Sequence, residues 1–479
     1  MGESNKSTSY TTSMVVLTSL FFMWGFITCM NDILIPYLKK VFELTYFEAM
    51  LVQFSFFGAY FIGSVVYFIL SIKIGDPIMK IGYKNGIIIG LLISAVGCLL
   101  FYPAASYKLY VFFLAALFVL ALGFTLLQIA ANPYVAILGK PETASSRLNL
   151  SQAFNSFGTT IAPIIGGYLV FTFFARTGEP LTNSLGHPIE MGDGSFISAN
   201  GVQIPYLIFA SLFLLLALMI WFVRLPRLES SETIEKGLGV FKYPHLVLGI
   251  VAIFMYVGGE VSIGSMLINY MKEMFSYPET EAKSFLAFYW GGAMIGRFLG
   301  AISLSNITSS IKKTGLMFIA AIVSFLLIFF AVNYEGDIAF ERVAPFLMFM
   351  LINLLAFRFG RSLPHRTLMI FALVVITLLL TTLFTNGFLA LWTVIGIGLF
   401  NSIMWSNIFT LAIKDLGKYT SQGSSLLVMA ILGGAIIPLI QGAVADGIGI
   451  HYSFFVPVFC YIYLAYYGWK GYKPNSKID

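Results

Sequence analysis

Long apolar runs, each the length of a membrane-spanning helix, fill the chain from Met14 to Tyr467. They are apolar on all sides and nearly free of charge, as segments that cross a bilayer are. In lipid every backbone amide must be hydrogen-bonded within the protein, so a spanning structure is either a helix or a closed barrel. Barrel strands would alternate between apolar and polar positions over about ten residues. The runs are longer and do not alternate, so the pattern predicts an all-α polytopic membrane protein.

Basic residues fix the orientation of these predicted helices. They gather in alternate loops, which the positive-inside rule assigns to the cytoplasm together with both termini. The stretch 332–386 keeps this alternation when it forms two helices around a basic turn that holds Arg358, Arg361 and Arg366. The chain is then expected to cross the membrane fourteen times, near residues 14–36, 47–72, 86–104, 110–137, 149–173, 204–223, 244–271, 282–304, 314–332, 343–357, 367–385, 388–413, 420–444 and 450–469.

The chain also repeats itself. The residues Tyr37-Leu-Lys-Lys-Val-Phe42 recur as Tyr270-Met-Lys-Glu-Met-Phe275, and Phe56-Phe-Gly-Ala-Tyr-Phe-Ile-Gly63 recurs as Tyr289-Trp-Gly-Gly-Ala-Met-Ile-Gly296, both at an offset of about 233 residues. Many secondary transporters are built from two parallel halves of this kind, with the substrate near their interface. The repeat therefore makes a carrier the leading interpretation.

The repeat and the helix count together predict two six-helix bundles plus an extra helix pair. We expect an N-terminal bundle over 1–224, a cytoplasmic linker over 225–243 and a C-terminal bundle over 244–479. The extra pair is expected as a helical-hairpin insertion at about 333–386, between the ninth and tenth core helices.

Composition narrows the function further. Hydrophobic residues make up 58% of the chain and charged residues 10%, whereas a soluble domain carries roughly 25% charged residues. The net charge of +6 comes from dispersed residues, so no nucleic-acid partner is expected. The histidines and cysteines show no metal-ligand spacing and no nucleophile–base cluster. We therefore expect a monomeric, multi-pass protein of the cell inner (plasma) membrane that is not an enzyme and uses no metal and no cofactor.

Two acidic residues lie inside predicted spans, where an ionisable side chain is costly and often functional. Asp32 shares a helix face with Trp24 and Asn31, and it is either an ion-coupling group or a solvated carboxylate near the outer mouth. Glu260 lies deeper, and it serves either binding and coupling or only as a structural partner of Arg297.

Neutral polar side chains form two further stripes. The fourth span carries Thr125, Gln128 and Asn132 on one face, and the fifth carries Gln152 with Asn155 or Ser156. Amides both donate and accept hydrogen bonds, which suits a ligand rich in hydroxyl groups. Hydrogen bonding between helices is the alternative explanation. Aromatic rings that stack well on a pyranose lie in or near these stripes, namely those of Trp24, Tyr60, Tyr289 and Trp290.

Several longer motifs resemble the major facilitator superfamily, and in particular its fucose/glucose–galactose symporter branch. The loop Gly75-Asp-Pro-Ile-Met-Lys80-Ile-Gly82 is similar to the loop motif of the superfamily. The branch is indicated by Trp24-Gly-Phe-Ile-Thr-Cys-Met-Asn-Asp-Ile-Leu-Ile-Pro36, Gln53-Phe-Ser-Phe-Phe-Gly-Ala-Tyr-Phe61, Leu127-Gln-Ile-Ala-Ala-Asn-Pro-Tyr134, Arg147-Leu-Asn-Leu-Ser-Gln-Ala-Phe-Asn155, Gly259-Glu-Val-Ser-Ile-Gly-Ser265 and Phe400-Asn-Ser-Ile-Met404.

This resemblance implies a major facilitator fold and a cation-coupled importer of a neutral hexose, with glucose and galactose preferred. It implies an ion-coupling role for Asp32 and a place in the sugar site for Gln152 and Asn155. We expect Asn401, which lies in one of the resembling motifs, to be a further sugar contact. Gln128 stands where fucose symporters carry a glutamate, so either Glu260 supplies the second carboxylate or the coupling ion is Na⁺ rather than H⁺. An L-fucose:proton symporter and a drug:proton antiporter remain the alternatives.

Overall fold

The computed structural model describes residues 2–44, 46–174, 177–182, 187–189, 196–223, 237–277, 279–335 and 338–474. Within these ranges it leaves out the side chains of residues 2–11, 31–33, 36, 39–40, 46–47, 49–50, 163–164, 167, 171–172, 279–280 and 334–335. The predicted site residues Asn31 and Asp32 therefore lie outside the described side chains.

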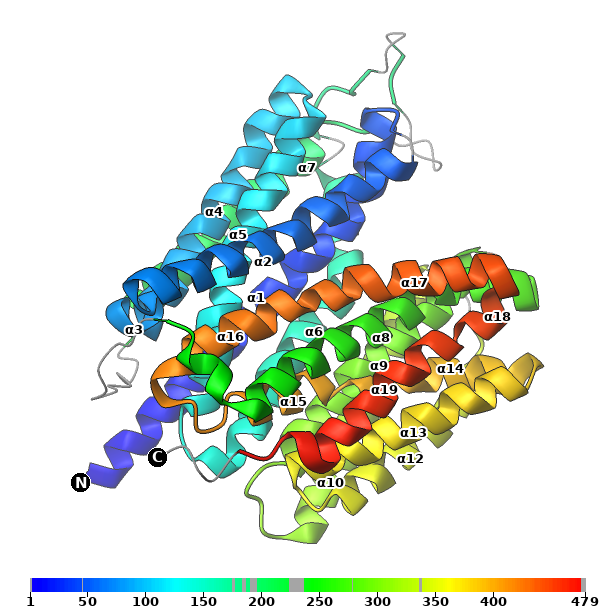
Figure 1. The fold of residues 1–479 in the computed structure, drawn as a ribbon. Coiled ribbons are helices and arrows are strands. Elements are labelled where there is room, and N and C mark those ends of the chain that lie inside the picture. Colours follow the sequence, from blue (N-terminus) through cyan, green and yellow to red (C-terminus); the bar gives the residue numbers. More distant parts are fainter. Residues whose placement is uncertain are drawn as a thin grey trace. The chain divides into compact units, whose positions relative to one another are not determined.

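The described chain is almost entirely helical (Figure 1). The first helices are α1 (Gly2–Val41), α2 (Tyr46–Ile74), α3 (Pro77–Ile81), α4 (Tyr83–Tyr107), α5 (Tyr110–Ile137), α6 (Ala144–Tyr168) and α7 (Asn200–Phe222). They are followed by α8 (Pro244–Phe275), α9 (Glu279–Ser303), α10 (Ser310–Glu335), α11 (Phe340–Val343), α12 (Pro345–Gly360), α13 (Pro364–Phe384), α14 (Gly387–Asn401), α15 (Met404–Ala412), α16 (Thr420–Met429), α17 (Gly433–Ile448), α18 (Ile450–Ser453) and α19 (Phe455–Tyr466). Two isolated antiparallel bridges pair Pro180 with Ser198 and Thr182 with Pro188.

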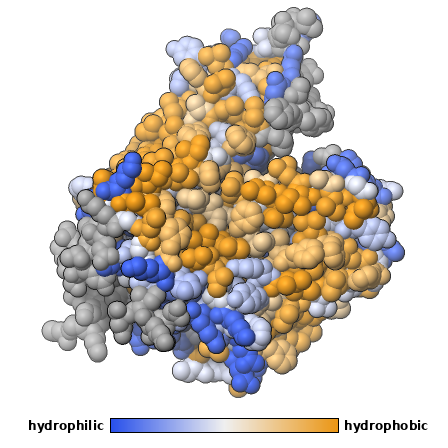
Figure 2. Space-filling model, viewed as in Figure 1, coloured by the Kyte–Doolittle hydropathy of each residue, from blue (hydrophilic) through white to orange (hydrophobic). Residues whose placement is uncertain are grey.

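Thirteen helical segments of the described chain are long and apolar enough to cross a membrane. They coincide with thirteen of the fourteen predicted spans and include both helices of the 332–386 stretch. The remaining prediction, 149–173, falls on α6, a helix of 25 residues. The side chains of residues 163, 164 and 167 within α6 are not described, so this helix is not counted among the thirteen. Apolar residues cover most of the helical surface that Figure 2 shows, as expected of surfaces that face lipid.

The chain divides into two compact units. Unit 1 comprises Met1–Tyr134 and Phe157–Gly237, and unit 2 comprises Val135–Ser156 and Leu238–Asp479. The segment Val135–Ser156 belongs by sequence to the first half but packs with the second. As a result α6 begins in unit 2 and continues into unit 1 directly after Ser156.

The internal repeat seen in the sequence is also a repeat of contacts. In unit 1 the Tyr37 hydroxyl donates to the Ser198 carbonyl oxygen, just before α7 begins, at 3.2 Å. In unit 2 the matching Tyr270 hydroxyl lies 3.2 Å from Nδ1 of His451 on α18. The end of the first helix of each unit is thus tied to the start of its last helix.

A second pair of matching contacts involves Gly63 of α2 and Gly296 of α9. A Cβ at Gly63 would lie 3.0 Å from Leu122 and 3.1 Å from Thr125, both on α5. A Cβ at Gly296 would lie 2.6 Å from the Leu399 oxygen on α14 and 2.1 Å from Ser402. The helices approach closely because neither glycine has a side chain, and α5 and α14 are therefore counterparts in the two units.

In the loop after α2, which resembles the superfamily motif, Asp76 has a structural role. Oδ1 of Asp76 accepts hydrogen bonds from the Tyr67 hydroxyl at 2.5 Å and from the Ile78 amide at 2.9 Å. The side chain therefore caps the N-terminus of α3 and fixes the turn between α2 and α4.

Candidate functional site

In unit 1 the predicted polar stripe forms a buried cluster around Tyr60. The Trp24 indole Nε1 donates to the Tyr60 hydroxyl at 3.4 Å, and the Gln128 side chain lies near the same hydroxyl. Asn132 Nδ2 donates to the Gln128 backbone oxygen at 3.2 Å and to its Oε1 at 3.5 Å. Three predicted site residues from α1 and α5 therefore meet around one tyrosine of α2.

The described side chains of the cluster are uncharged and almost completely buried. The exposed fractions are 6% for Trp24, 6% for Gln128 and 0% for Asn132. Gln128 and Asn132 are one helical turn apart, which places both amides on the same face of α5. The Thr125 hydroxyl instead donates to backbone oxygens, those of Ala121 in its own helix at 2.8 Å and of Ala59 on α2 at 3.4 Å. The cluster thus offers amides and an indole N–H, which are groups that recognise hydroxyls.

In unit 2 a continuous hydrogen-bonded chain joins four helices. The Tyr461 hydroxyl of α19 donates to Asn401 Oδ1 at 2.6 Å, and Asn401 Nδ2 donates to the Tyr289 hydroxyl at 2.9 Å. The Tyr289 hydroxyl then donates to the backbone oxygen of Glu260 at 2.8 Å. Tyr289, Asn401 and Glu260 were predicted from the sequence, and the structure brings them together in one buried network.

The Glu260 carboxylate lies halfway along α8 and is only 9% exposed. The Tyr256 hydroxyl, one turn earlier on α8, and the Arg297 guanidinium of α9 both interact with it electrostatically. A buried carboxylate is stable only when nearby groups compensate its charge or when it binds a proton or a cation. Glu260 therefore has the surroundings of an ion-responsive group.

Arg297 links α9 to two other helices of unit 2. Its Nε donates to the Ser402 backbone oxygen at 3.1 Å, and its Nη1 donates to the Ser156 hydroxyl of α6. The sequence left open whether Asn155 or Ser156 completes the α6 stripe, and the structure gives this contact to Ser156. The sequence offered Arg297 as a structural partner of Glu260. In the structure Arg297 donates its hydrogen bonds to a hydroxyl and a carbonyl group, and it lies within electrostatic reach of Glu260.

Gln152 and Asn155 lie on the part of α6 that belongs to unit 2. Gln152 is 7% exposed, and Asn155 is half-buried. Gln152 and Ser156 are one turn apart and share a face, so the predicted sugar-binding amide and the contact of Arg297 stand next to each other on α6.

Trp290 is the predicted residue that stands apart from this network. Its ring centroid lies 5.1 Å from that of Tyr289, but the side chain is 41% exposed. Consecutive helical residues point in directions about 100° apart, so Tyr289 enters the network while Trp290 packs along Gly264.

Sequence analysis missed two aromatic residues of unit 2. Tyr461 lies in an apolar run with no polar stripe, so only the structure identifies it, whereas Tyr256 already shares a predicted helix face with Glu260. Trp405 is 8% exposed, and its indole Nε1 has no hydrogen-bond partner. The internal repeat could have identified Trp405. Thr125 and Ser402 occupy matching positions, because they contact the matching glycines of α2 and α9. Trp405 follows Ser402 by three residues, as Gln128 follows Thr125, so Trp405 is the counterpart of Gln128.

The fold and these two clusters define the class of protein. A polytopic helical protein built from two repeated bundles, each with buried polar side chains, has the architecture of a secondary transporter. Residues 15–343 match the family model described as the Major Facilitator Superfamily. The chain belongs to this superfamily, as its motifs suggested, and membership in a family of transporters agrees with the expectation that it is not an enzyme.

Relatives and solved structures are similar over nearly the whole chain. The "Glucose/galactose transporter" of Brucella abortus is 44% identical over 476 residues, covering 98% of this chain and 97% of the relative. The "L-fucose-proton symporter" of Escherichia coli is 32% identical over 468 residues, covering 96% and 93%. The crystal structure of the E. coli fucose:proton symporter FucP, variant N162A, superposes with a TM-score of 0.73 at 29% identity, covering 97% of this chain and 99% of FucP.

Proposed function

We propose that this protein is a cation-coupled symporter that imports a neutral hexose by alternating access of its two halves. The observation that carries the proposal is the pair of buried clusters rich in amides and hydroxyls, one in each unit, in a chain whose relatives are named as sugar transporters. Apart from Glu260 and Arg297, the described members of these clusters are neutral, which suits a ligand that carries many hydroxyl groups and no charge.

Glucose and galactose are the proposed substrates rather than L-fucose. Support comes from the higher identity to the glucose/galactose transporter, 44% against 32% for the L-fucose symporter. We assign sugar contacts to Asn31, Gln128 and Asn132 in the first half, and to Gln152, Asn155 and Asn401 beyond it. Trp24, Tyr289, Trp290 and Trp405 are the proposed aromatic contacts.

Ion coupling is proposed for two carboxylates, Asp32 and Glu260. Gln128 cannot titrate, so the α5 position that carries a glutamate in fucose symporters does not supply a proton site here. Glu260 is buried beside one hydroxyl and within reach of one guanidinium, and it is therefore our candidate for the second carboxylate. The ion is H⁺ or Na⁺.

We also propose that the protein is monomeric and lies in the plasma membrane with both termini in the cytoplasm. The basic loops support this orientation. A cysteine introduced at Lys473 of an otherwise cysteine-free variant is expected to react with an impermeant maleimide only after the membrane is opened. Labelling of intact cells would reverse the topology.

The function is tested with purified protein in proteoliposomes. Uptake of labelled glucose, galactose, L-fucose and xylose is measured under an imposed H⁺ or Na⁺ gradient. We expect concentrative uptake of glucose and galactose with one of the two gradients. Uptake of none of these sugars, together with efflux of a hydrophobic dye driven by protons, would favour the antiporter instead.

A further inference from the structure

We propose that Arg297 is a positioning residue that connects the sugar-binding helix α6 to the Glu260 carboxylate, because it donates to Ser156 in one state of the transport cycle and to Glu260 in another. The proposal rests on the sugar-symporter function proposed above and adds a physical link between the sugar site and the ion site.

The first step of the argument is the geometry of the guanidinium. The Nε–H of Arg297 is held by the Ser402 backbone oxygen at 3.1 Å, which anchors the group at α14. One terminal nitrogen donates to the Ser156 hydroxyl. A guanidinium has five N–H donors in a planar fork, so the terminal nitrogens can change acceptor while Nε keeps its bond to Ser402.

The second step concerns the acceptor that competes with Ser156. The Glu260 carboxylate is buried and attracted by Arg297 without forming an ion pair with it. The other titratable groups that act on Glu260 are the hydroxyls of Tyr256 on α8, Tyr289 on α9 and Tyr461 on α19. Arg297 is the one cation among these described neighbours, so its position controls the charge balance of the carboxylate.

The third step is the position of Ser156 on α6. Gln152, a proposed sugar contact, precedes it by one turn on the same face. The division between the two units falls directly after Ser156. A shift of α6 when sugar binds to Gln152 therefore acts on the Ser156–Arg297 contact.

The cycle then follows from competition for one cation. While Ser156 holds Arg297, Glu260 lacks a direct counter-charge in a buried site, and its protonated form is favoured. When α6 withdraws Ser156, Arg297 turns to Glu260 and pairs with the ionised carboxylate. The O–H bond of the carboxyl group then breaks and its proton passes to water. This exchange suits H⁺ as the coupling ion, because a carboxylate paired with a guanidinium has no room for Na⁺.

The test compares two variants that should act in opposite directions. Ser156→Ala frees Arg297 for Glu260, so protonation requires more acid and the pH profile of sugar exchange should move down by about one unit. Arg297→Gln removes the cation, so the profile should move up by about one unit. Ser156→Thr keeps the hydroxyl and should restore the wild-type profile.

Controls separate this role from a structural one. Ser262→Ala removes a buried hydroxyl that bonds only within α8, and it should leave the profile unchanged. In a Glu260→Gln background neither Ser156→Ala nor Arg297→Gln should shift the profile further. Elution in size-exclusion chromatography and thermal stability in detergent show whether each variant is folded.

The proposal can be overturned at two levels. Arg297 has no role in coupling if the pH profile of sugar exchange shifts in the same direction in Ser156→Ala and Arg297→Gln, or shifts in neither variant. The same conclusion follows if the shifts persist in the Glu260→Gln background, and in each of these cases sugar binding stays normal. Absence of glucose and galactose binding to the wild-type protein would overturn the proposed function itself, and this inference with it.

Discussion

The repeat-related helices α2 and α9 have similar sequences but opposite surroundings. On α2 a Cβ at Gly58 would meet nothing within 4 Å, and Ile62 is 48% exposed. On α9 a Cβ at the matching Gly291 would lie 2.6 Å from Ile328 of α10, and the matching Ile295 is 0% exposed. A helix face that is open in unit 1 is therefore covered by protein in unit 2.

The cover consists of α10 and α12. Phe288 of α9 packs against Phe325 of α10 with ring centroids 6.2 Å apart, and against Phe346 of α12 at 5.4 Å. The covered positions on α9 are apolar, as are the open positions on α2. A face that suits lipid also suits an apolar helix, so an added helix pair can cover it without a change in its chemistry.

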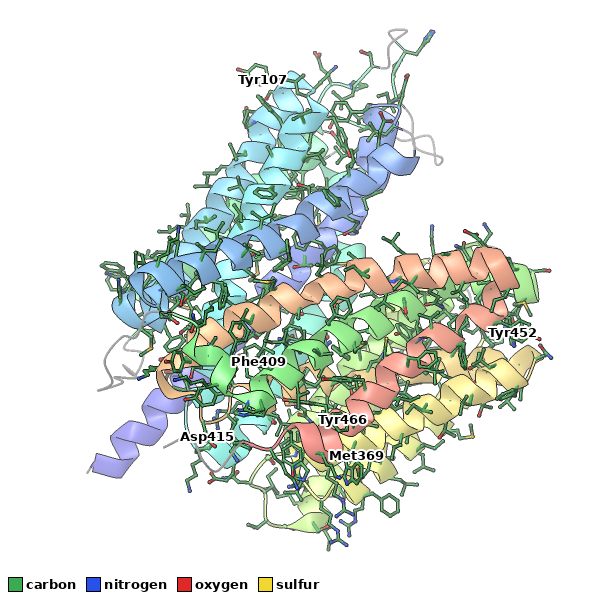
Figure 3. All side chains as sticks on the ribbon, viewed as in Figure 1. Tyr107, Met369, Phe409, Asp415, Tyr452 and Tyr466 are labelled. Atoms are coloured by element: carbon green, nitrogen blue, oxygen red, sulfur yellow. The ribbon has the colours of Figure 1, made fainter. Side chains whose placement is uncertain are left out.

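The same comparison shows which helices were added. In unit 1 α4 packs along α7, and its Ser94 hydroxyl donates to the Leu120 oxygen of α5 at 3.5 Å. In unit 2 α13 packs along α14 and α19, the counterparts of α5 and α7, and a Cβ at Gly468 would lie 2.8 Å from the Met369 amide. Figure 3 labels Met369 on α13 and Tyr466 on α19.

From this packing we infer that α13 is the counterpart of α4 and that α10 and α12 are the extra pair. The insertion then lies between the eighth and ninth core helices, one helix earlier than the sequence-based expectation of about 333–386. The two ends of the insertion lie close together. The Ser362 hydroxyl, just before α13, donates to the backbone oxygen of Ser303 at the end of α9, at 2.6 Å.

The largest expected effect comes from the carboxylates, one on the first helix of each half. Asp32→Asn keeps the shape of the side chain and removes its charge, and it should abolish concentrative uptake while sugar exchange partly survives. Glu260→Gln should show the same loss of accumulation if both halves carry an ion site. Accumulation at the wild-type level by Asp32→Asn would leave Glu260 as the coupling group and make the halves unequal.

The assignment of the extra helices is tested by two deletions. Removal of residues 306–360 behind a short Gly-Ser linker should leave a folded carrier with sugar exchange, because the deleted ends are in contact and the exposed α9 face is apolar. Removal of 340–384, which takes away α13, should prevent folding because α14 and α19 lose their partner. Folding is judged by fluorescence-detected size-exclusion chromatography. The reverse outcome would return the insertion to 333–386.

The sugar contacts should produce a smaller loss. Gln152→Ala and Asn155→Ala should each weaken glucose binding by about 1 to 3 kcal/mol, because a sugar hydroxyl loses its partner in a buried site. Gln128→Ala tests the first half in the same way. Isothermal titration in detergent measures the three affinities. Unchanged binding in all three would take the amides out of the site.

The smallest effect concerns the covered glycine itself. Gly291→Leu should destabilise the protein by about 1 to 3 kcal/mol, since the new side chain meets Ile328. Gly58→Leu is the matched change on α2 and should be nearly neutral in stability. Thermal unfolding in detergent gives the difference. Equal destabilisation by both changes would mean that the α2 face is not open.

Sequence patterns predicted where the helices lie far better than they predicted how the helices pack. Apolar runs locate helices reliably because lipid demands them, and the repeat led to the two halves. The network of Tyr289, Asn401 and Tyr461 was only partly predicted, because a tyrosine in an apolar run gives no periodic signal until a partner from another helix is known. Our inference moves the extra pair by one helix for a related reason, since three successive apolar helices look alike until their neighbours are seen.

The contact between Ser303 and Ser362 also makes α10–α12 a replaceable cassette. Its two ends enter and leave the fold at one point, so a rigid soluble domain with closely spaced termini can be joined there through two short connections. Such a fusion would hold a large, recognisable mass against unit 2 while α13 and α14 keep their places. It would serve as a fiducial for electron cryo-microscopy of a carrier whose described residues are almost all helical.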